Sequence, residues 1–325
     1  MSIAMPALPP GFTARAPRLP DDADAIAGLI TACETAEYGS PDPGMIDGAR
    51  ATWQRPDFAA ASDGWFVAAP NGTLAGYAQV GPAYRVHQYA HAFVHPAYAG
   101  RGLGAWLLAR TETRTRERAA TAFAGQTITL EQWIAGANEA ARAMMRAAGY
   151  DEVRHIWGMR VDLPDAPEPP SWPEGIAVRA CASDADLRRA YAANEEAFRD
   201  HWHYEPQTYE QFASMLVETD AFDPSLWFLA ETGEDDEVAG IALCEVLADR
   251  GWVNQLAVRR PWRGHGLGMA LLRHAFAEFA RRGLQTAALG VDAQNPTGAT
   301  RLYERAGMAV ERRYDIFEKT LPITG

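Results

Sequence analysis

The sequence predicts two copies of one mixed α/β (α+β) domain, each a mostly antiparallel mixed sheet with helices on both faces. A duplication is the first observation: residues 93–108, FVHPAYAGRGLGAWLL, repeat residues 257–272, AVRRPWRGHGLGMALL. A repeat at so long a period indicates two domains rather than a solenoid. The length of 325 residues also exceeds one usual core. In each half, a helix pair precedes mostly antiparallel strands and a β-α-β-α-β close, as expected for such a sheet.

A proline-rich segment separates the two copies. Residues 163–175 read LPDAPEPPSWPEG, a composition that favours an extended, semi-rigid connector. We therefore expect an N-terminal domain over residues 1–163, a linker over 164–174 and a C-terminal domain over 175–325.

The elements of both halves follow from apolar periodicity, turn residues and caps. In the first half they are a strand at 11–17, helices ending near 34 and spanning 43–53, a hairpin over 64–80, a strand at 88–94, a long helix, and a strand at 127–134. In the second half they are a strand at 176–179, helices at 184–198 and 206–217, a strand at 226–231, a strand that follows residues 233–237 and ends near Leu247, a strand at 251–258, a helix ending at Gly283, a strand at 286–292, a helix from about 297 to 305 and a strand near 314–319.

The stretch from Gln255 to Leu272, QLAVRRPWRGHGLGMALL, is a strand, a glycine turn and a helix. Glycines allow a ligand to approach the backbone closely, and the unpaired N–H groups of a helix start favour an anion. A phosphate-bearing ligand is therefore expected at this turn.

Two common phosphate motifs do not fit the turn. A dinucleotide fingerprint counted from Gly264 would need a glycine where Met269 stands. A Walker loop needs Gly-Lys-Ser/Thr, and the only lysine of the chain is Lys319. The segment Arg263 to Gly268 instead resembles the R/Q-x-x-G-x-G/A acyl-CoA pyrophosphate loop of the GNAT superfamily of N-acetyltransferases.

A second signature of that family follows downstream. GVDAQNPTGATRLYERAGM, residues 290–308, is similar to the GNAT strand, Asn and helix with Leu-Tyr-x-x-x-Gly-Met/Phe. The resemblance covers most of residues 175–321 and implies acetyl-CoA, or another short acyl-CoA, as co-substrate. It also implies that the Tyr303 hydroxyl acts as general acid near the CoA sulfur; the alternative is an aromatic side chain of the core. The cofactor-binding residues that the resemblance implies are Leu256, Ala257, Val258, Arg263, Gly264, His265, Gly266, Leu267, Gly268 and Asn295.

The general base and the acceptor site are assigned from weaker sequence patterns than the cofactor-binding residues. GNAT enzymes often use a Glu or an ordered water on the central strands, and Glu245 is the only carboxylate of its predicted strand. Alternation places Glu245 with Leu243 and Leu247, on either the substrate face or the core face. RDHWHYEP lies where this family builds its acceptor pocket, which implies substrate binding by His201, His203, Tyr204 and Glu205. A polar loop with incidental histidines is the alternative, and a His-x-His pair alone does not predict a metal site.

The first copy lacks part of this chemistry. Ala99 replaces Arg263, and Met145 stands opposite Tyr303 when Gly149 is aligned with Gly307. We expect a degenerate half with a possible second, weak cofactor site, formed by Val94, Gly100, Arg101, Gly102, Leu103 and Gly104.

Composition narrows the class of partner. The net charge of −12 argues against nucleic acid and mildly favours a cationic substrate such as an amine, although it also serves solubility. The sequence shows no membrane span and no signal-peptide pattern, and its three scattered cysteines suit reduced thiols, so a cytoplasmic protein is expected.

We therefore expect an acetyl-CoA-dependent N-acetyltransferase that acts on a primary amine of a small molecule by direct transfer in a ternary complex. The tandem layout is also similar to that of the mycothiol synthases, so acetylation of a cysteinyl sugar is one alternative. An antibiotic self-resistance acetyltransferase and a non-catalytic CoA-binding module are the others. The sequence leaves the oligomeric state open.

Overall fold

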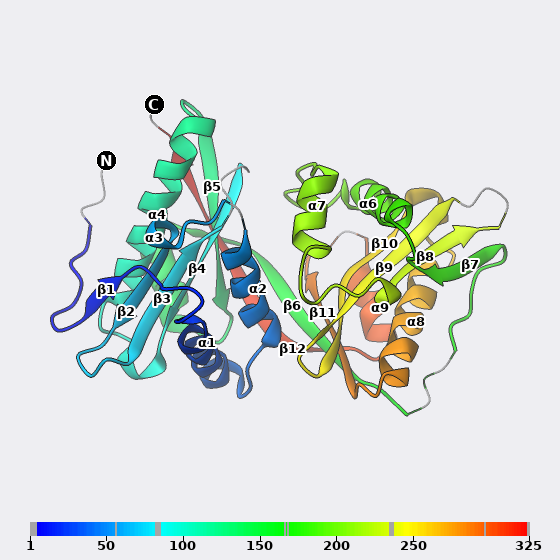
Figure 1. The fold of residues 1–325 in the computed structure, drawn as a ribbon, viewed down its shortest axis with the longest axis horizontal. Helices are drawn as coiled ribbons and strands as arrows, with labels where there is room; N and C mark the ends of the chain where they lie inside the picture. The colour runs from blue at the N-terminus through cyan, green and yellow to red at the C-terminus, as the bar shows by residue number, and fades with distance from the viewer. Residues whose placement is uncertain are drawn as a thin grey trace. The chain divides into compact units, whose positions relative to one another are not determined.

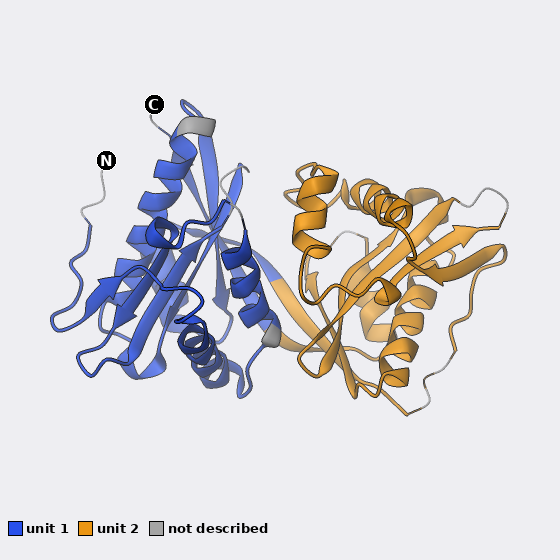
Figure 2. Cartoon of the chain, viewed as in Figure 1, with its two compact units in different colours: residues 1–155, 313–325 blue, residues 156–312 orange. Residues whose placement is uncertain are grey.

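The computed structural model describes residues 5–55, 57–81, 86–165, 167, 169–233, 237–295 and 297–323. The chain forms two compact units, residues 1–155 with 313–325 (unit 1) and residues 156–312 (unit 2) (Figure 2). Each unit is a mixed sheet with helices on both faces, which confirms the predicted fold class (Figure 1). Among the described residues, no helix is both long and apolar enough to cross a bilayer.

Unit 1 has the strand order β1-β2-β3-β4-β5-β12, and only the β4–β5 pair is parallel. Its strands are β1 (Thr13–Arg15), β2 (Gly64–Ala68), β3 (Leu74–Val80), β4 (His87–Val94), β5 (Thr127–Ala135) and part of β12 (Ala309–Pro322). Its helices are α1 (Ala23–Tyr38), α2 (Pro43–Gln54), α3 (Ala60–Asp63), α4 (Leu103–Ala122) and α5 (Glu139–Ala147), with a 3-10 turn η1 (Pro96–Tyr98). The α1 and α2 side of the sheet has its own apolar core, and α4 and α5 cover the opposite face.

Unit 2 repeats this plan with the order β7-β8-β9-β10-β11-β6, where only β10–β11 is parallel. Its strands are β7 (Ile176–Ala180), β8 (Trp227–Thr232), β9 (Val238–Leu247), β10 (Arg250–Val258), β11 (Thr286–Asp292) and part of β6 (Asp151–Asp162). Its helices are α6 (Asp184–Phe198), α7 (Tyr209–Leu216), α8 (Leu267–Arg281) and α9 (Ala299–Arg305), with 3-10 turns η2 (Pro224–Leu226) and η3 (Arg260–Trp262). Helices α6 and α7 cover one face, and α8 and α9 the other.

The two halves of the sequence exchange their last strands. β6 ends the first half, yet its residues 156–162 pair antiparallel with β11 in unit 2. β12 ends the second half, yet its residues 314–322 pair antiparallel with β5 in unit 1. Met159 is buried in the core of unit 2 and Phe317 in that of unit 1. The compact units therefore do not coincide with the predicted domains 1–163 and 175–325, because each sheet is completed by a strand from the other half.

Several local features explain where the helices begin. Ser183 caps α6, and Thr208 caps α7 in a capping box with Gln211. By contrast, the N-cap residues that precede α8 and α4 are Gly266 and Gly102, both left-handed with φ of 85° and without a side-chain cap hydrogen bond. The backbone donors at these two helix starts are therefore left for other partners. The three cysteines are free and buried.

Candidate active site

The glycine turn before α8 presents a row of backbone donors. Gly264 and Gly266 have φ values of 83° and 85°, which strain any residue with a Cβ, and no atom lies within 4 Å of where a Cβ would stand. Among the described residues, no acceptor pairs with the N–H groups of residues 264–268. Gly268 differs, because a Cβ there would lie 3.1 Å from Leu302 Cδ1. This glycine allows α8 to pack against α9.

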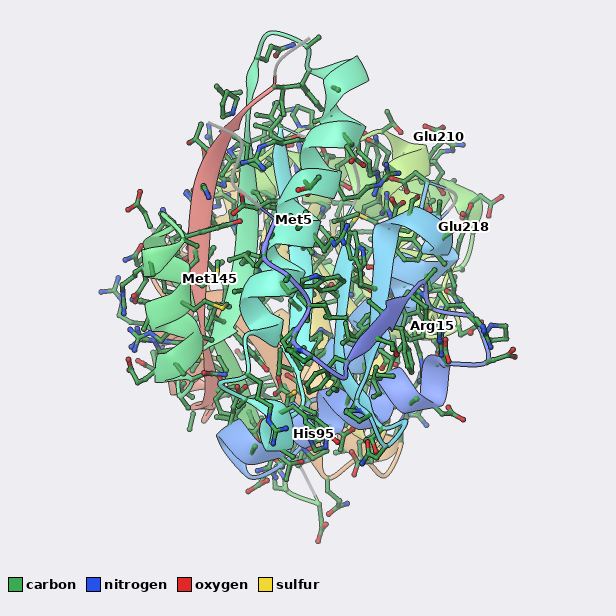
Figure 3. All side chains as sticks on the ribbon, turned by 90° about the vertical axis from the view of Figure 1, so that its left-hand side faces the viewer. Met5, Arg15, His95, Met145, Glu210 and Glu218 are labelled. Carbon is green, nitrogen blue, oxygen red and sulfur yellow. The ribbon has the colours of Figure 1, made fainter. Side chains whose placement is uncertain are left out.

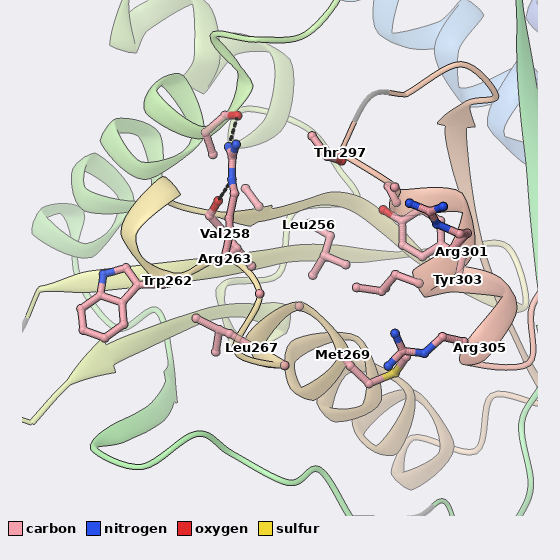
Figure 4. A pocket seen from close by; sticks show the side chains of 18 of the residues that line it. Leu256, Val258, Trp262, Arg263, Leu267, Met269, Thr297, Arg301, Tyr303 and Arg305 are labelled. Carbon is pink, nitrogen blue, oxygen red and sulfur yellow. Dashed lines mark hydrogen bonds between the residues drawn. The ribbon is translucent and has the colours of Figure 1, made fainter.

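A cavity of about 610 Å³ opens beside this turn (Figure 4). Its walls come from the end of α6, the end of β10, the glycine turn and α9. The lining residues include Leu256, Ala257, Val258, Arg263, Gly264, Gly266, Leu267 and Gly268 from the predicted cofactor set. His265 and Asn295 are not among them. The structure thus brings most of the predicted cofactor residues to one cavity, although no ligand tests their role.

The strand edge in this cavity is open. β10 pairs with β11 only through Gly251 and Trp252, whereas its pairing with β9 continues to Val258. The register of the β9 pairing shifts between Val253 and Gln255, where the two parallel strands part. The β11 side of residues 253–258 is therefore available to an extended ligand, which would add as a strand.

Arg263 points its guanidinium at backbone carbonyls. Its Nε donates to the Val258 carbonyl at 2.9 Å and its Nη2 to the Ala197 carbonyl at 3.1 Å (Figure 4). Asp200 Oδ2 lies 3.7 Å from its Nη1. The side chain therefore links the end of β10 to the end of α6, a role that the sequence did not indicate.

Two further arginines line the cavity from α9. Arg301 and Arg305 stand on the same helix as Tyr303 (Figure 4). Sequence analysis did not single them out, because nothing in the local pattern shows what a charged side chain on this helix faces. Only the placement of α9 shows that both side chains reach the cavity.

Tyr303 is buried in the wall of the cavity and 8% exposed. Burial raises the pKa of its phenol to about 12. The hydroxyl therefore stays protonated at neutral pH and is available as a proton donor. Tyr303 also packs in the core around α8, so both sequence interpretations, core aromatic and cavity hydroxyl, describe parts of its environment.

Asn295 shapes the turn before α9. Its Oδ1 accepts hydrogen bonds from the backbone N–H of Thr297 at 2.8 Å and from the Thr297 hydroxyl at 2.6 Å. Thr297, which sequence analysis did not name, lines the cavity instead. A direct contact of Asn295 with the cofactor stays a prediction.

Glu245 lies on the α6 and α7 side of β9. It alternates with Leu243, which packs in the core under these helices, while Cys244 faces α8. The Asn254 amide donates to Glu245 Oε1 at 3.0 Å. Glu245 does not line the described cavity, so any proton transfer to it would need a water or the acceptor itself as intermediary.

The four predicted substrate residues do not converge. His201 lines the cavity, and burial lowers the pKa of its imidazole, which favours the neutral form. His203 has a positive φ of 54° and stacks on Trp202. The Tyr204 hydroxyl donates to Glu195 at 2.8 Å. Tyr204 therefore holds the loop in place, and Glu205 is not among the lining residues of the 610 Å³ cavity.

The first half keeps the backbone cradle but changes the side chains. Gly100 and Gly102 have φ values of 72° and 85°, as in the second turn. The carbonyl of Val94, which corresponds to Val258, accepts from the Cys33 thiol at 3.2 Å. Met145, marked in Figure 3, is buried in the core where Tyr303 stands in the second half. Binding of CoA by this half stays a prediction.

A glycine turn with free N–H groups, an open strand edge and a buried tyrosine in one cavity fit an acyl-CoA-dependent transferase. Comparison with known proteins agrees with this class. Two segments, residues 26–150 and 187–308, match the model of the acetyltransferase (GNAT) family. The chain therefore belongs to the GNAT family of acetyltransferases and uses acetyl-CoA or another acyl-CoA as co-substrate.

Individual relatives match from about three quarters to nearly all of the chain. Mycothiol acetyltransferases from Streptomyces avermitilis and Nocardia farcinica are 35% and 31% identical, covering 73% and 89% of this chain and 73% and 91% of theirs. A GCN5-related N-acetyltransferase from Sphaerobacter thermophilus is 37% identical with a TM-score of 0.84, covering 98% of both chains. A tandem GNAT protein from the clavulanic acid biosynthesis pathway, 17% identical with a TM-score of 0.69 over 95% of this chain and 98% of that one, shares the fold.

Proposed function

We propose that unit 2 transfers the acetyl group of acetyl-CoA directly to a primary amine of a small molecule. The observation that carries this proposal is the buried Tyr303 hydroxyl in the wall of the cavity that also holds the glycine turn. The N–H groups of residues 264–268 would bind the pyrophosphate, and the open edge of β10 would hold the pantetheine arm.

The reaction requires a neutral amine and a proton for the departing thiolate. The amine nitrogen attacks the thioester carbonyl, the C–S bond breaks, and the Tyr303 hydroxyl gives its proton to the sulfur. The attacking nitrogen loses a proton to a base. The products are an amide and free CoA.

Two residues are candidates for the base. Glu245 was predicted for this role, and Asn254 holds its carboxylate in place. Burial lowers the pKa of His201, which favours its neutral form, and this residue lines the cavity itself. Replacing each residue by Gln and recording turnover against pH distinguishes the two candidates. Turnover normally falls at low pH because the base becomes protonated, and this fall should disappear in the variant that lacks the true base.

The acceptor has two candidates. A primary amine in general follows from the chemistry of the site. A cysteinyl sugar is favoured by the relatives named mycothiol acetyltransferase, which are 31–35% identical. A thiol-release assay with acetyl-CoA against simple amines, cysteinyl sugars and aminoglycosides tests them together. Turnover with cysteinyl sugars at least about a hundredfold above the other classes would select the second candidate, and no thiol release with any amine would contradict both.

A further inference from the structure

Unit 1 contains a second cavity, of about 250 Å³, that lies apart from its glycine turn. It is bounded by α2 on one side and by β3, β4 and β5 on the other. The lining residues are Gly44, Met45, Gly48, Ala49, Thr52, Gln79, Tyr89, His91, Phe93, Glu131 and Trp133. Among these described residues, Glu131 is the one carboxylate, and no lysine or arginine is present.

The amide nitrogen of Gln79, a residue of this cavity wall, has no hydrogen-bond partner. Its Oε1 accepts from Trp53 Nε1 at 2.8 Å and from the Tyr77 hydroxyl at 2.7 Å. These two donors fix the orientation of the amide and identify Nε2 as the group left without a partner. Nε2 is buried with no hydrogen-bond partner, and Gln79 is 1% exposed. A buried donor of this kind is costly unless a ligand or water accepts its hydrogen bond.

Glu131 is held in the wall by Trp133, whose Nε1 donates to its carboxylate. Glu318 stands directly opposite Glu131 on β12, so both side chains lie on the same face of the sheet. Burial raises the pKa of the Glu131 carboxyl, and burial together with Glu131 raises that of Glu318 to about 7. His87 and Arg154 offset part of this effect at Glu318. A cation in the cavity would relieve the cost of holding negative charge there.

Aromatic side chains supply the remaining recognition. Tyr89, Phe93 and Trp133 line the cavity, and aromatic faces attract organic cations. Burial lowers the pKa of His91 to about 4, so this imidazole adds no competing positive charge. We propose that this cavity in unit 1 binds a small organic cation that carries a hydroxyl group, with Glu131 facing the cation and Gln79 Nε2 donating to the hydroxyl oxygen. The site uses no residue assigned to acetyl transfer.

Choline is a suitable probe, because it combines a quaternary ammonium with one hydroxyl. Calorimetry on the full-length protein without acyl-CoA should detect its binding. 3,3-Dimethylbutan-1-ol has the same shape without the charge and should bind at least about tenfold more weakly. Tetramethylammonium lacks the hydroxyl and should also bind more weakly than choline. These three measurements require no variant.

A charge-neutral variant locates the site. Glu131→Gln keeps an acceptor for Trp133 Nε1 and should weaken choline binding at least about tenfold. Glu117→Gln, on the exposed side of α4, removes the same charge outside the cavity and should leave the affinity unchanged. Near-UV circular dichroism confirms that both variants are folded. No choline binding, equal binding of the neutral analogue or of tetramethylammonium, or equal loss in the two variants would overturn the proposal.

Discussion

At the scale of single residues, Tyr303 is the group whose role depends most on its surroundings. Burial raises the pKa of its hydroxyl to about 12, so the group remains protonated from roughly pH 6 to 9. Tyr303→Phe should lower kcat on the order of 10²-fold and leave acetyl-CoA affinity nearly unchanged, because the proton moves only as the thiolate leaves. The deficit should be constant over that pH range. Steady-state kinetics and calorimetry provide the two values.

Tyr150→Phe is the matched control for Tyr303→Phe. Tyr150 is also a buried tyrosine whose pKa is raised by burial, but it belongs to the core of unit 1. Removal of the Tyr150 hydroxyl in Tyr150→Phe should therefore leave turnover unchanged. Full activity of the Tyr303 variant would assign that residue to packing alone.

Arg263 has two possible roles, and salt dependence separates them. As a phosphate ligand it would act through charge, whereas its contacts with the Val258 and Ala197 carbonyls position the turn. Arg263→Ala should weaken acetyl-CoA binding roughly tenfold or more, since hydrogen bonds of charged groups contribute about 1.5–3 kcal/mol. If positioning dominates, as the structure favours, the loss should be the same at low and high salt. A loss that shrinks as salt rises would restore the phosphate role.

At the scale of elements, the two glycine turns form a natural pair for comparison. Gly266 and Gly102 both begin a helix with φ of 85°, so valine at either position should destabilise the protein by about 1–2 kcal/mol or more. Gly266→Val also introduces a side chain into the cavity that should hold acetyl-CoA, and KM should rise strongly. Gly102→Val should reduce thermal stability while KM stays near the original value. Equal KM values in the two variants would contradict the assignment of the second turn.

At the scale of the whole molecule, the strand exchange determines which fragments can fold. A fragment of residues 172–325 keeps every residue proposed for catalysis but lacks β6, which pairs with β11. It also lacks two buried core side chains, Met159 of β6 and Leu163 just after it. Its unit 2 should lose about 1.5–3 kcal/mol for each of these side chains, together with a strand partner. Thermal unfolding should therefore begin well below that of the full chain.

A longer fragment of residues 151–325 restores β6 and serves as the control. It should regain most of the stability of unit 2. Identical melting of the two fragments would show that β6 adds nothing. Acetyl transfer by residues 1–165 at a rate comparable to the whole protein would contradict the division of labour between the halves.

The sequence by itself determined the duplication, the mixed sheet, the glycine turn and the acyl-CoA chemistry. Short stretches of sequence indicate these features. They are glycines where φ is positive, helical spacing of apolar residues after Gly266, and two motifs that resemble GNAT signatures at a fixed separation. Glu245 and Tyr303 were proposed from their positions in such patterns, and their catalytic roles stay predictions. Local sequence patterns were sufficient to predict these turns and helices, because turn geometry and helix faces depend on residues that are close together in the chain.

Only the tertiary structure decided the remaining features, because they join residues far apart in the chain. β6 has no turn signal that assigns it to β11, and its exchange with β12 depends on which sheet edge each strand can cover. Arg263 contacts Ala197 across 66 residues, and Arg301 lines the cavity because α9 lies beside α8, where Gly268 leaves room for Leu302. Gln79 and Glu131 became neighbours in one cavity through the pairing of β3, β4 and β5. Long-range packing supplies no periodicity that a sequence alone could reveal.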